Sequence, residues 1–84
     1  MADFILFGTA GCHLCEEAEQ LLADAGLAFS TRDIIDDEQW LARYGLLIPV
    51  LLHTASGKQL NWPFDRLQLE SFAASEPKAR PDRR

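Results

Sequence analysis

The chain has 84 residues, of which 48% are hydrophobic, and a formal net charge of −5 at pH 7. This size indicates a single small domain, and no apolar run is long enough for a membrane span or an export signal. Residues 1–75 contain eleven acidic and four basic groups, a balance that would repel the phosphates of nucleic acid. We therefore expect a monomeric cytoplasmic protein that binds neither nucleic acid nor a membrane.

The first part of the sequence predicts a strand, a helix and a second strand. Residues 4–7 form a continuous apolar run, which is typical of a buried strand. From Cys12 the apolar residues recur at helical spacing, and Gly26 suits the end of this helix. Residues 27–34 alternate in polarity as a strand does. The three segments predict a βαβ unit with a right-handed crossover.

A second, short helix is predicted after this unit. Asp36 and Asp37 favour a helix start because carboxylates accept hydrogen bonds from the free backbone N–H groups there. Trp40, Leu41 and Tyr44 then lie on one side of the helix. We expect the two aromatic side chains to pack against the core rather than to bind a ligand.

A β-hairpin is predicted next. Residues 46–53 read as a buried strand, although Pro49 lies inside it and lacks the N–H group that a strand needs. Ser56 and Gly57 predict a turn into a fourth strand over residues 58–62, antiparallel to the third. The proline should therefore occupy an unpaired position or follow a special peptide bond.

A third helix is predicted to begin at Asp65. Asp65 and Gln68 have the spacing of a capping box, in which each residue satisfies a backbone N–H of the other. Phe64 and Leu69 have the spacing of a hydrophobic staple across the same helix start.

The predicted element order is β-α-β-α-β-β-α. This order indicates an α/β fold with a four-stranded mixed sheet flanked by helices. We expect one domain over residues 1–74. Residues 75–84 contain two prolines and no hydrophobic residue larger than alanine, so we expect a disordered, charged tail there.

Cys12 and Cys15 are the only cysteines, and they stand three positions apart at the start of the first predicted helix. A disulfide scaffold is disfavoured because such scaffolds usually carry several bridges. A zinc site would need four ligands, and the only histidines are His13, adjacent to Cys12, and His53. We therefore expect no metal site, and the spacing favours a redox-active pair.

The position at a helix start gives the two cysteines different expected roles. The free N–H groups and the helix dipole stabilise a thiolate on Cys12 and lower the pKa of that thiol, which makes it the candidate nucleophile. Cys15, one turn further along, is the candidate resolving thiol. His13 would favour the thiolate further when protonated, or else it is an exposed residue with no tuning role.

The stretch FILFGTAGCHLCEEAEQLL, the later segment IPVLL and the predicted element order together resemble the thioredoxin superfamily, and most closely its small bacterial glutaredoxin-like proteins. The resemblance covers residues 3–74. It implies a thiol-disulfide oxidoreductase in cell redox homeostasis that acts on disulfide-containing proteins or on glutathione mixed disulfides. No tightly bound cofactor is implied, and glutathione is a candidate co-substrate.

Pro49 matches the cis-proline that precedes the third strand in this superfamily and faces the active-site sulfurs. The resemblance therefore implies a cis bond between Ile48 and Pro49. It also implies that the Ile48 backbone is free to pair with an extended substrate.

Three segments depart from the glutaredoxin pattern. Thr9, Ala10 and Gly11 stand where a basic residue commonly precedes the first cysteine. His13 and Leu14 replace the Pro-Tyr pair that commonly separates the cysteines, and NWPFD replaces the two glycines and the polar-acidic pair that hold the glutathione carboxylate. Asp65 could take the acidic position, although an N-cap explains it equally well. Trp62 is either part of a substrate platform beside the cysteines or a core residue, and Phe64 is expected in the core.

Two functions are compatible with these features. The leading hypothesis is an enzyme that uses the Cys12–Cys15 dithiol and is itself reduced by glutathione or by a thioredoxin-like protein. The alternative is a non-catalytic binding module of the same fold, in which the two cysteines act as a redox-sensitive latch.

Overall fold

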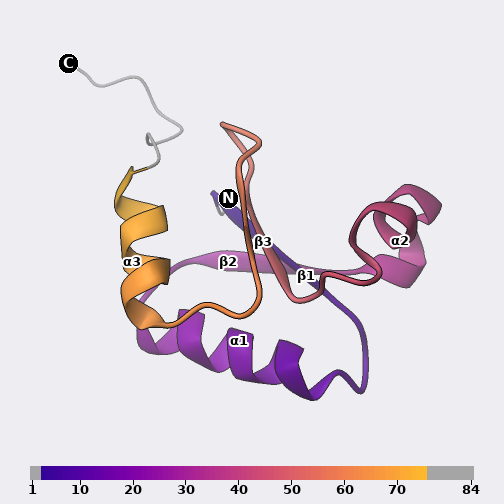
Figure 1. Cartoon of the computed structure of the whole chain (residues 1–84), viewed down its shortest axis with the longest axis horizontal. Helices are drawn as coiled ribbons and strands as arrows, with labels where there is room; N and C mark the ends of the chain where they lie inside the picture. Colours follow the sequence, from indigo (N-terminus) through magenta and orange to yellow (C-terminus); the bar gives the residue numbers. More distant parts are fainter. Residues whose placement is uncertain (1–2, 76–84) are drawn as a thin grey trace.

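A computed structural model describes residues 3–75, and its centre is a four-stranded mixed sheet with strand order β2-β1-β3-β4 (Figure 1). The elements in chain order are β1 (Phe4–Gly8), α1 (His13–Asp24), β2 (Phe29–Asp33), the 3-10 helix η1 (Ile34–Asp36), α2 (Glu38–Tyr44), β3 (Val50–His53), β4 (Gln59–Asn61) and α3 (Arg66–Ser75). The predicted α/β class and the predicted β-α-β-α-β-β-α order are confirmed, with η1 as an additional turn.

The strand directions decide which loops meet. β1 pairs in parallel with β2 and antiparallel with β3, and β3 pairs antiparallel with β4. The last residues of β1 and β2 therefore lie at the same end of the sheet as the first residue of β3. The loop that leads into α1 leaves from this end, so it lies close to the segment that precedes β3.

Helices cover the two faces of the sheet separately. Alternate residues of β1 point to opposite faces, so Phe4 and Leu6 join α1 and α3 in one core cluster, whereas Phe7 joins α2 in another. Figure 1 shows α1 and α3 on one side of the sheet and α2 at the other side. This arrangement fixes α1, and with it the two cysteines, against the β1 strand.

The ends of α1 and the start of α2 follow local signals in the sequence. Gly26 follows α1 with a positive φ of 73°, and its N–H group donates to the Ala23 carbonyl, so its predicted role at the helix end is confirmed. Asp37 caps α2 by accepting hydrogen bonds from the backbone N–H groups of Gln39 (2.8 Å) and Trp40 (3.4 Å). The helix start predicted at the aspartate pair is therefore confirmed at Asp37.

The aromatic residues of α2 pack as predicted, but Leu41 does not. Tyr44 is 3% exposed and stacks on Phe7 with ring centroids 4.4 Å apart. Trp40 meets the edge of the same ring at 5.4 Å. Leu41, which we expected on this side, is 49% exposed because a helix turns about 100° per residue, and Leu41 lies past the edge of the buried side.

The strand predicted over residues 46–53 begins only at Val50. The Tyr44 carbonyl accepts hydrogen bonds from the N–H groups of Leu47 (2.7 Å) and Ile48 (3.1 Å), so the chain first closes α2 with a turn. Leu46 is fully exposed in this turn. The apolar segment before Pro49 is thus a surface loop rather than the start of a strand.

Several further boundaries differ from the prediction. The second strand begins at Phe29 rather than at residue 27, and the fourth covers only Gln59–Asn61 of the predicted 58–62. The second strand ends at Asp33 because its carboxylate accepts a hydrogen bond from the Ile35 N–H (3.1 Å) and begins η1. Ser75, which the sequence places in the tail, is the last residue of α3, since Phe72 and Ala73 in the preceding turn still pack against the core. The rest of the predicted disordered tail, residues 76–84, lies outside the described residues, as do residues 1–2.

The helices within residues 3–75 are short, and none combines the length and the apolar character needed to cross a membrane.

Candidate active site

Cys12 and Cys15 form a disulfide at the start of α1. Cys12 is the N-cap of this helix, and its sulfur accepts a hydrogen bond from the Cys15 backbone N–H at 3.1 Å. A helix start has free N–H groups that favour a negative partner. The N-terminus of α1 would therefore stabilise a thiolate on the Cys12 sulfur.

The two sulfurs differ in their access to solvent. Cys12 is partly exposed, whereas Cys15 is 4% exposed. A disulfide substrate can therefore approach Cys12 more readily than Cys15. The order of attack, in which Cys12 reacts first, stays a prediction.

Gly8, the last residue of β1, makes room for the buried sulfur. A Cβ atom at this position would lie 2.9 Å from the Cys15 Sγ and 3.1 Å from the Cys15 Cβ. Contacts this short do not occur between real side chains, so the close approach of α1 to β1 requires a glycine here. The sequence indicated Gly8 only as the end of a strand, and its contact with Cys15 depends on how the helix packs.

The Pro49 segment reaches the same end of the sheet. Phe7 pairs with Val50, so Pro49 and Gly8 occupy the next positions on the two neighbouring strands. The Ile48–Pro49 peptide bond is cis, and Pro49 is fully buried. Because Gly8 contacts Cys15, this register brings the backbone before β3 to the neighbourhood of the disulfide.

Trp62 is joined to Pro49 through the backbone. The Trp62 N–H donates to the Pro49 carbonyl at 3.2 Å, and the Trp62–Pro63 peptide bond is also cis. The Trp62 side chain is half-buried and meets the ring of Phe64 edge-on at 5.1 Å. Phe64 is 5% exposed, which confirms its predicted place in the core, and Trp62 packs against the same cluster.

Asp65 forms the predicted capping box. Its carboxylate accepts a hydrogen bond from the Gln68 N–H at 2.8 Å, and the Gln68 side chain accepts one from the Asp65 N–H at 3.0 Å. Both groups at the start of α3 therefore already have partners within the helix.

His13 points along the surface of α1. Its Nε2 lies 3.0 Å from the Glu17 carboxylate, one turn further, and both side chains are exposed. The two form an ion pair when His13 is protonated. His13, which stands between the two cysteines in the sequence, is thus held beside Glu17 on the surface of α1.

The structure separates the residues that could have formed a metal site. His53 pairs with Phe4 at the opposite end of β1 from Gly8 and the disulfide. Within residues 3–75, no group of three or more His, Cys, Asp or Glu side chains is arranged to hold a metal ion.

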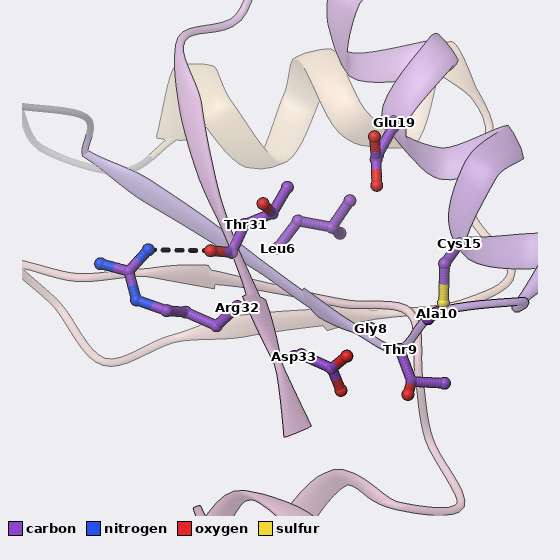
Figure 2. Close-up of a pocket in the computed structure, with 9 residues that line it drawn as sticks. All are labelled: Leu6, Gly8, Thr9, Ala10, Cys15, Glu19, Thr31, Arg32 and Asp33. Carbon is purple, nitrogen blue, oxygen red and sulfur yellow. Dashed lines mark hydrogen bonds between the residues drawn. The ribbon is translucent and has the colours of Figure 1, made fainter. Parts of the chain in front are cut away.

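A cavity of about 210 Å³ opens beside Cys15, between α1 and the ends of β1 and β2 (Figure 2). Its lining residues are Leu6, Gly8, Thr9, Ala10, Cys15, Glu19, Thr31, Arg32 and Asp33. The Arg32 guanidinium donates to the Thr31 carbonyl at 2.8 Å. Glu19 and Asp33 thus line the same cavity as Cys15, which the sequence did not reveal because β2 and α1 meet only in the folded chain.

Residues 3–72 match the model of the family described as "Glutaredoxin-like domain (DUF836)". Two solved structures of target protein XcR50 from X. campestris are similar to the chain. The X-ray structure has a TM-score of 0.81 at 37% identity and covers 88% of this chain and 99% of its own. The solution structure has a TM-score of 0.80 at 39% identity and covers 94% of this chain and 100% of its own.

The solution structure of protein Ne2328 from Nitrosomonas europaea shares the fold. Its TM-score is 0.66 at 24% identity, with 84% of this chain and 89% of that chain covered. Among curated proteins, none matches the chain.

Proposed function

The chain belongs to the glutaredoxin-like domain family, within the thioredoxin superfamily, and from this premise we propose that it is a thiol-disulfide oxidoreductase. One observation carries the proposal: a Cys12–Cys15 pair at disulfide distance, with one sulfur accessible at a helix start and the other buried behind it. The two cysteines would alternate between a dithiol and a disulfide as the protein reduces its substrates.

The first step uses Cys12. In the reduced protein the Cys12 thiolate attacks one sulfur of a substrate disulfide, and the other substrate sulfur leaves as a thiolate. A mixed disulfide between Cys12 and the substrate remains. The position of Cys12 as the α1 N-cap supports this role because the Cys15 N–H already points at its sulfur.

The second step uses Cys15. Its thiol loses a proton and attacks the Cys12 sulfur, the substrate leaves as a thiol, and the Cys12–Cys15 disulfide forms. The Cα atoms of the two cysteines are 5.2 Å apart, a separation compatible with this bond. A dithiol such as a thioredoxin-like protein, or two glutathione molecules, would then reduce the disulfide and complete the cycle.

We propose that substrates lie along the segment before β3. Ile48 would offer its carbonyl to an extended chain, since its N–H already donates to the Tyr44 carbonyl. The half-buried Trp62 would form the adjoining surface, and the buried Pro49 would position the Ile48 backbone. Asp65 would contact a polar group of the substrate in addition to capping α3. The substrates would be disulfide-containing proteins or glutathione mixed disulfides, in the redox homeostasis of the cytoplasm, and the protein would act as a monomer without a bound cofactor.

Reduction of a glutathione mixed disulfide by the purified protein tests the enzymatic proposal. We expect activity that Cys12→Ser abolishes, because the mixed disulfide cannot form without the Cys12 sulfur. Cys15→Ser should still form the mixed disulfide and so serves as the matched control. Absence of activity with both small and protein disulfides would contradict the proposal.

Trapping with Cys15→Ser separates this function from a binding module with a redox-sensitive latch. An oxidoreductase should be recovered from cell extract as mixed disulfides with many different proteins, since the second step is blocked. A latch would give a single partner, or none.

A further inference from the structure

Exposed leucines stand on both segments that meet at the redox pair. Leu14, which lies between the two cysteines, is 44% exposed. Leu46 is fully exposed and Leu47 is 41% exposed, and both belong to the loop that leads to Pro49. This loop reaches the same end of the sheet as the disulfide. An apolar segment of a substrate would bury these side chains as it crosses the sulfurs.

Three acidic residues border the redox pair. Glu16 follows Cys15 directly in α1 and is exposed. Glu19 and Asp33 line the same cavity as Cys15 (Figure 2). A negatively charged substrate would therefore be repelled from this region, whereas a positively charged substrate would be attracted to it.

Most basic residues of the described chain either stand elsewhere in the fold or already pair with an acid. The Lys and Arg residues within the range 3–75 are Arg32, Arg43, Lys58 and Arg66. Arg66 forms an ion pair with Glu70 on α3 at 2.8 Å. The Lys58 carbonyl accepts a hydrogen bond from the His53 N–H, which places Lys58 at the opposite end of the sheet from the disulfide. Arg43 belongs to α2, which packs on the other face of the sheet from α1.

Two basic residues do stand near the redox pair, but each is already engaged. Arg32 lines the cavity, and its guanidinium donates to the Thr31 carbonyl at 2.8 Å. Figure 2 shows this guanidinium directed away from Cys15. His13, between the two cysteines in the sequence, lies 3.0 Å from the Glu17 carboxylate, which balances its charge when it is protonated. The surroundings of the pair therefore favour a cation over a carboxylate.

We propose that Cys12 acts on disulfides in polypeptide segments that carry both apolar and positively charged side chains, and that it reacts more slowly with glutathione disulfides. The inference rests on the proposed oxidoreductase function and identifies the substrate class of that function. The apolar side chains of the segment would cover the three exposed leucines, and its cations would lie beside Glu16. Glutathione carries two carboxylates and one ammonium group, so its net charge of about −1 at neutral pH would be repelled.

A matched series of 2-pyridyl disulfides tests this substrate class. Three peptides of equal length contain one cysteine between leucines and differ only in carrying two lysines, two serines or two glutamates, and the fourth substrate is glutathione. The Cys12 thiolate of the reduced protein forms a bond to the substrate sulfur. Pyridine-2-thiolate leaves with the electron pair of the broken bond and takes up a proton to give 2-thiopyridone, whose absorbance is followed. The rate with 2-mercaptoethanol, a neutral thiol, corrects for the intrinsic reactivity of each disulfide.

The charge and the apolar character of the substrate should affect the rate separately. We expect the lysine peptide to react about tenfold faster than the glutamate peptide or glutathione at low ionic strength. This difference should shrink in about 1 M sodium chloride, because charges farther apart than about 3 Å are then screened. Replacing the leucines of the lysine peptide with serine should slow the reaction at either salt concentration, since apolar contacts are not screened.

Substitutions in the protein locate the two effects. Glu16→Lys should lower the ratio of the lysine-peptide rate to the glutamate-peptide rate about threefold or more at low ionic strength. This ratio cancels any change in the reactivity of the Cys12 sulfur, since both peptides meet the same thiolate. Asp24→Lys is the matched control, because it makes the same change at the other end of α1 and should leave the ratio nearly unchanged. Leu46→Ser should weaken the preference for leucine over serine in the peptide, whereas Leu67→Ser, at an exposed position of α3, should not.

The possible failures of the inference and of the proposed function can be told apart. Equal corrected rates for all four substrates, or a faster reaction of glutathione, would overturn the substrate class and leave the oxidoreductase proposal intact. A lysine preference that Glu16→Lys and Asp24→Lys reduce equally would overturn the role of the charges beside the redox pair. If the reduced protein releases no 2-thiopyridone from any substrate, Cys12 is not a reactive thiol and the oxidoreductase proposal itself fails.

Discussion

Gly8 lacks a side chain, and the sulfur of Cys15 lies only 2.9 Å from the point where a Cβ atom of this residue would be. This contact joins the end of β1 to the first turn of α1. It places Cys15 against β1, and β1 pairs with β3, which begins next to Pro49. The position of the buried sulfur thus depends on one residue that carries no chemistry of its own.

Gly8→Ala should disturb the redox pair directly. The new methyl group would lie 2.9 Å from the Cys15 Sγ, so the sulfur must shift and the disulfide should form less favourably. We expect the fraction of dithiol to rise in a defined glutathione redox buffer, together with a loss of about 1–3 kcal/mol in stability.

Gly11→Ala provides the control for this substitution. Gly11 has a positive φ of 78°, and no residue other than its chain neighbours lies within 4 Å of an added Cβ, so alanine adds backbone strain next to Cys12 without touching the Cys15 sulfur. It should cost about 1 kcal/mol of stability and leave the dithiol fraction unchanged. A dithiol fraction that rises equally in both variants would show that strain, not the contact with Cys15, controls the pair.

At the scale of elements, helix ends are set by residues close to them in sequence. Asp65 and Gln68 satisfy each other's N–H groups at the start of α3, and Phe64 and Leu69 are both buried across this helix start. Asp65 therefore caps α3 whether or not it also contacts a ligand.

Substitutions of Asp65 separate the two roles that the sequence left open. Asp65→Ala should lower the stability by about 1 kcal/mol, whereas Asp65→Asn keeps an oxygen that can cap the helix and should cost much less. Chemical denaturation measures this difference. If Asp65→Asn nevertheless raises the KM for a glutathione mixed disulfide, the charge of Asp65 contributes to substrate binding.

The difference between local and distant contacts explains which elements could be predicted from the sequence. Gly26 and the capping box act on residues a few positions away, so their patterns are visible in the sequence. The start of β3 is not visible in the sequence, because Leu46 and Leu47 are as apolar as strand residues. Only the hydrogen bonds to the Tyr44 carbonyl reveal the turn. The pairing of Cys12 with Cys15 was likewise visible.

The surroundings of the cysteines required the folded chain. Glu19 and Asp33 line one cavity only because the folded chain brings α1 and β2 together, and this cavity has no signature in the order of residues. The packing of Gly8 against Cys15 is equally non-local. Leu41 was misplaced because the width of the buried side of α2 depends on how Trp40 and Tyr44 pack on Phe7, which periodicity does not specify.

At the scale of the whole molecule, two core clusters share the central strands. Leu22 and Leu51 belong to the cluster under α1 and α3, and Val50 belongs to the cluster under α2. Since β1 and β3 supply residues to both, loss of packing on one face weakens the sheet that supports the other. A domain of this size has little surplus stability to absorb such a loss.

Leu22→Ala should therefore destabilise the entire domain. Leu22 is fully buried, and removing its side chain is expected to cost about 2–5 kcal/mol. Leu46→Ala removes the same atoms from a fully exposed position and should change the stability by less than about 0.5 kcal/mol. Thermal unfolding followed by circular dichroism compares the two, and equal losses would contradict the assignment of the core.

The hydrogen bond from the Cys15 N–H to the Cys12 sulfur also has a spectroscopic consequence. An amide proton that points at a sulfur senses the charge on it, so the Cys15 amide resonance should move when the Cys12 thiol of the reduced protein ionises. A pH titration followed by NMR would then read the ionisation of the Cys12 thiol from a backbone signal, with no label on either cysteine. The amide of Leu69, which donates to the Asp65 carbonyl inside α3, should show no matching shift.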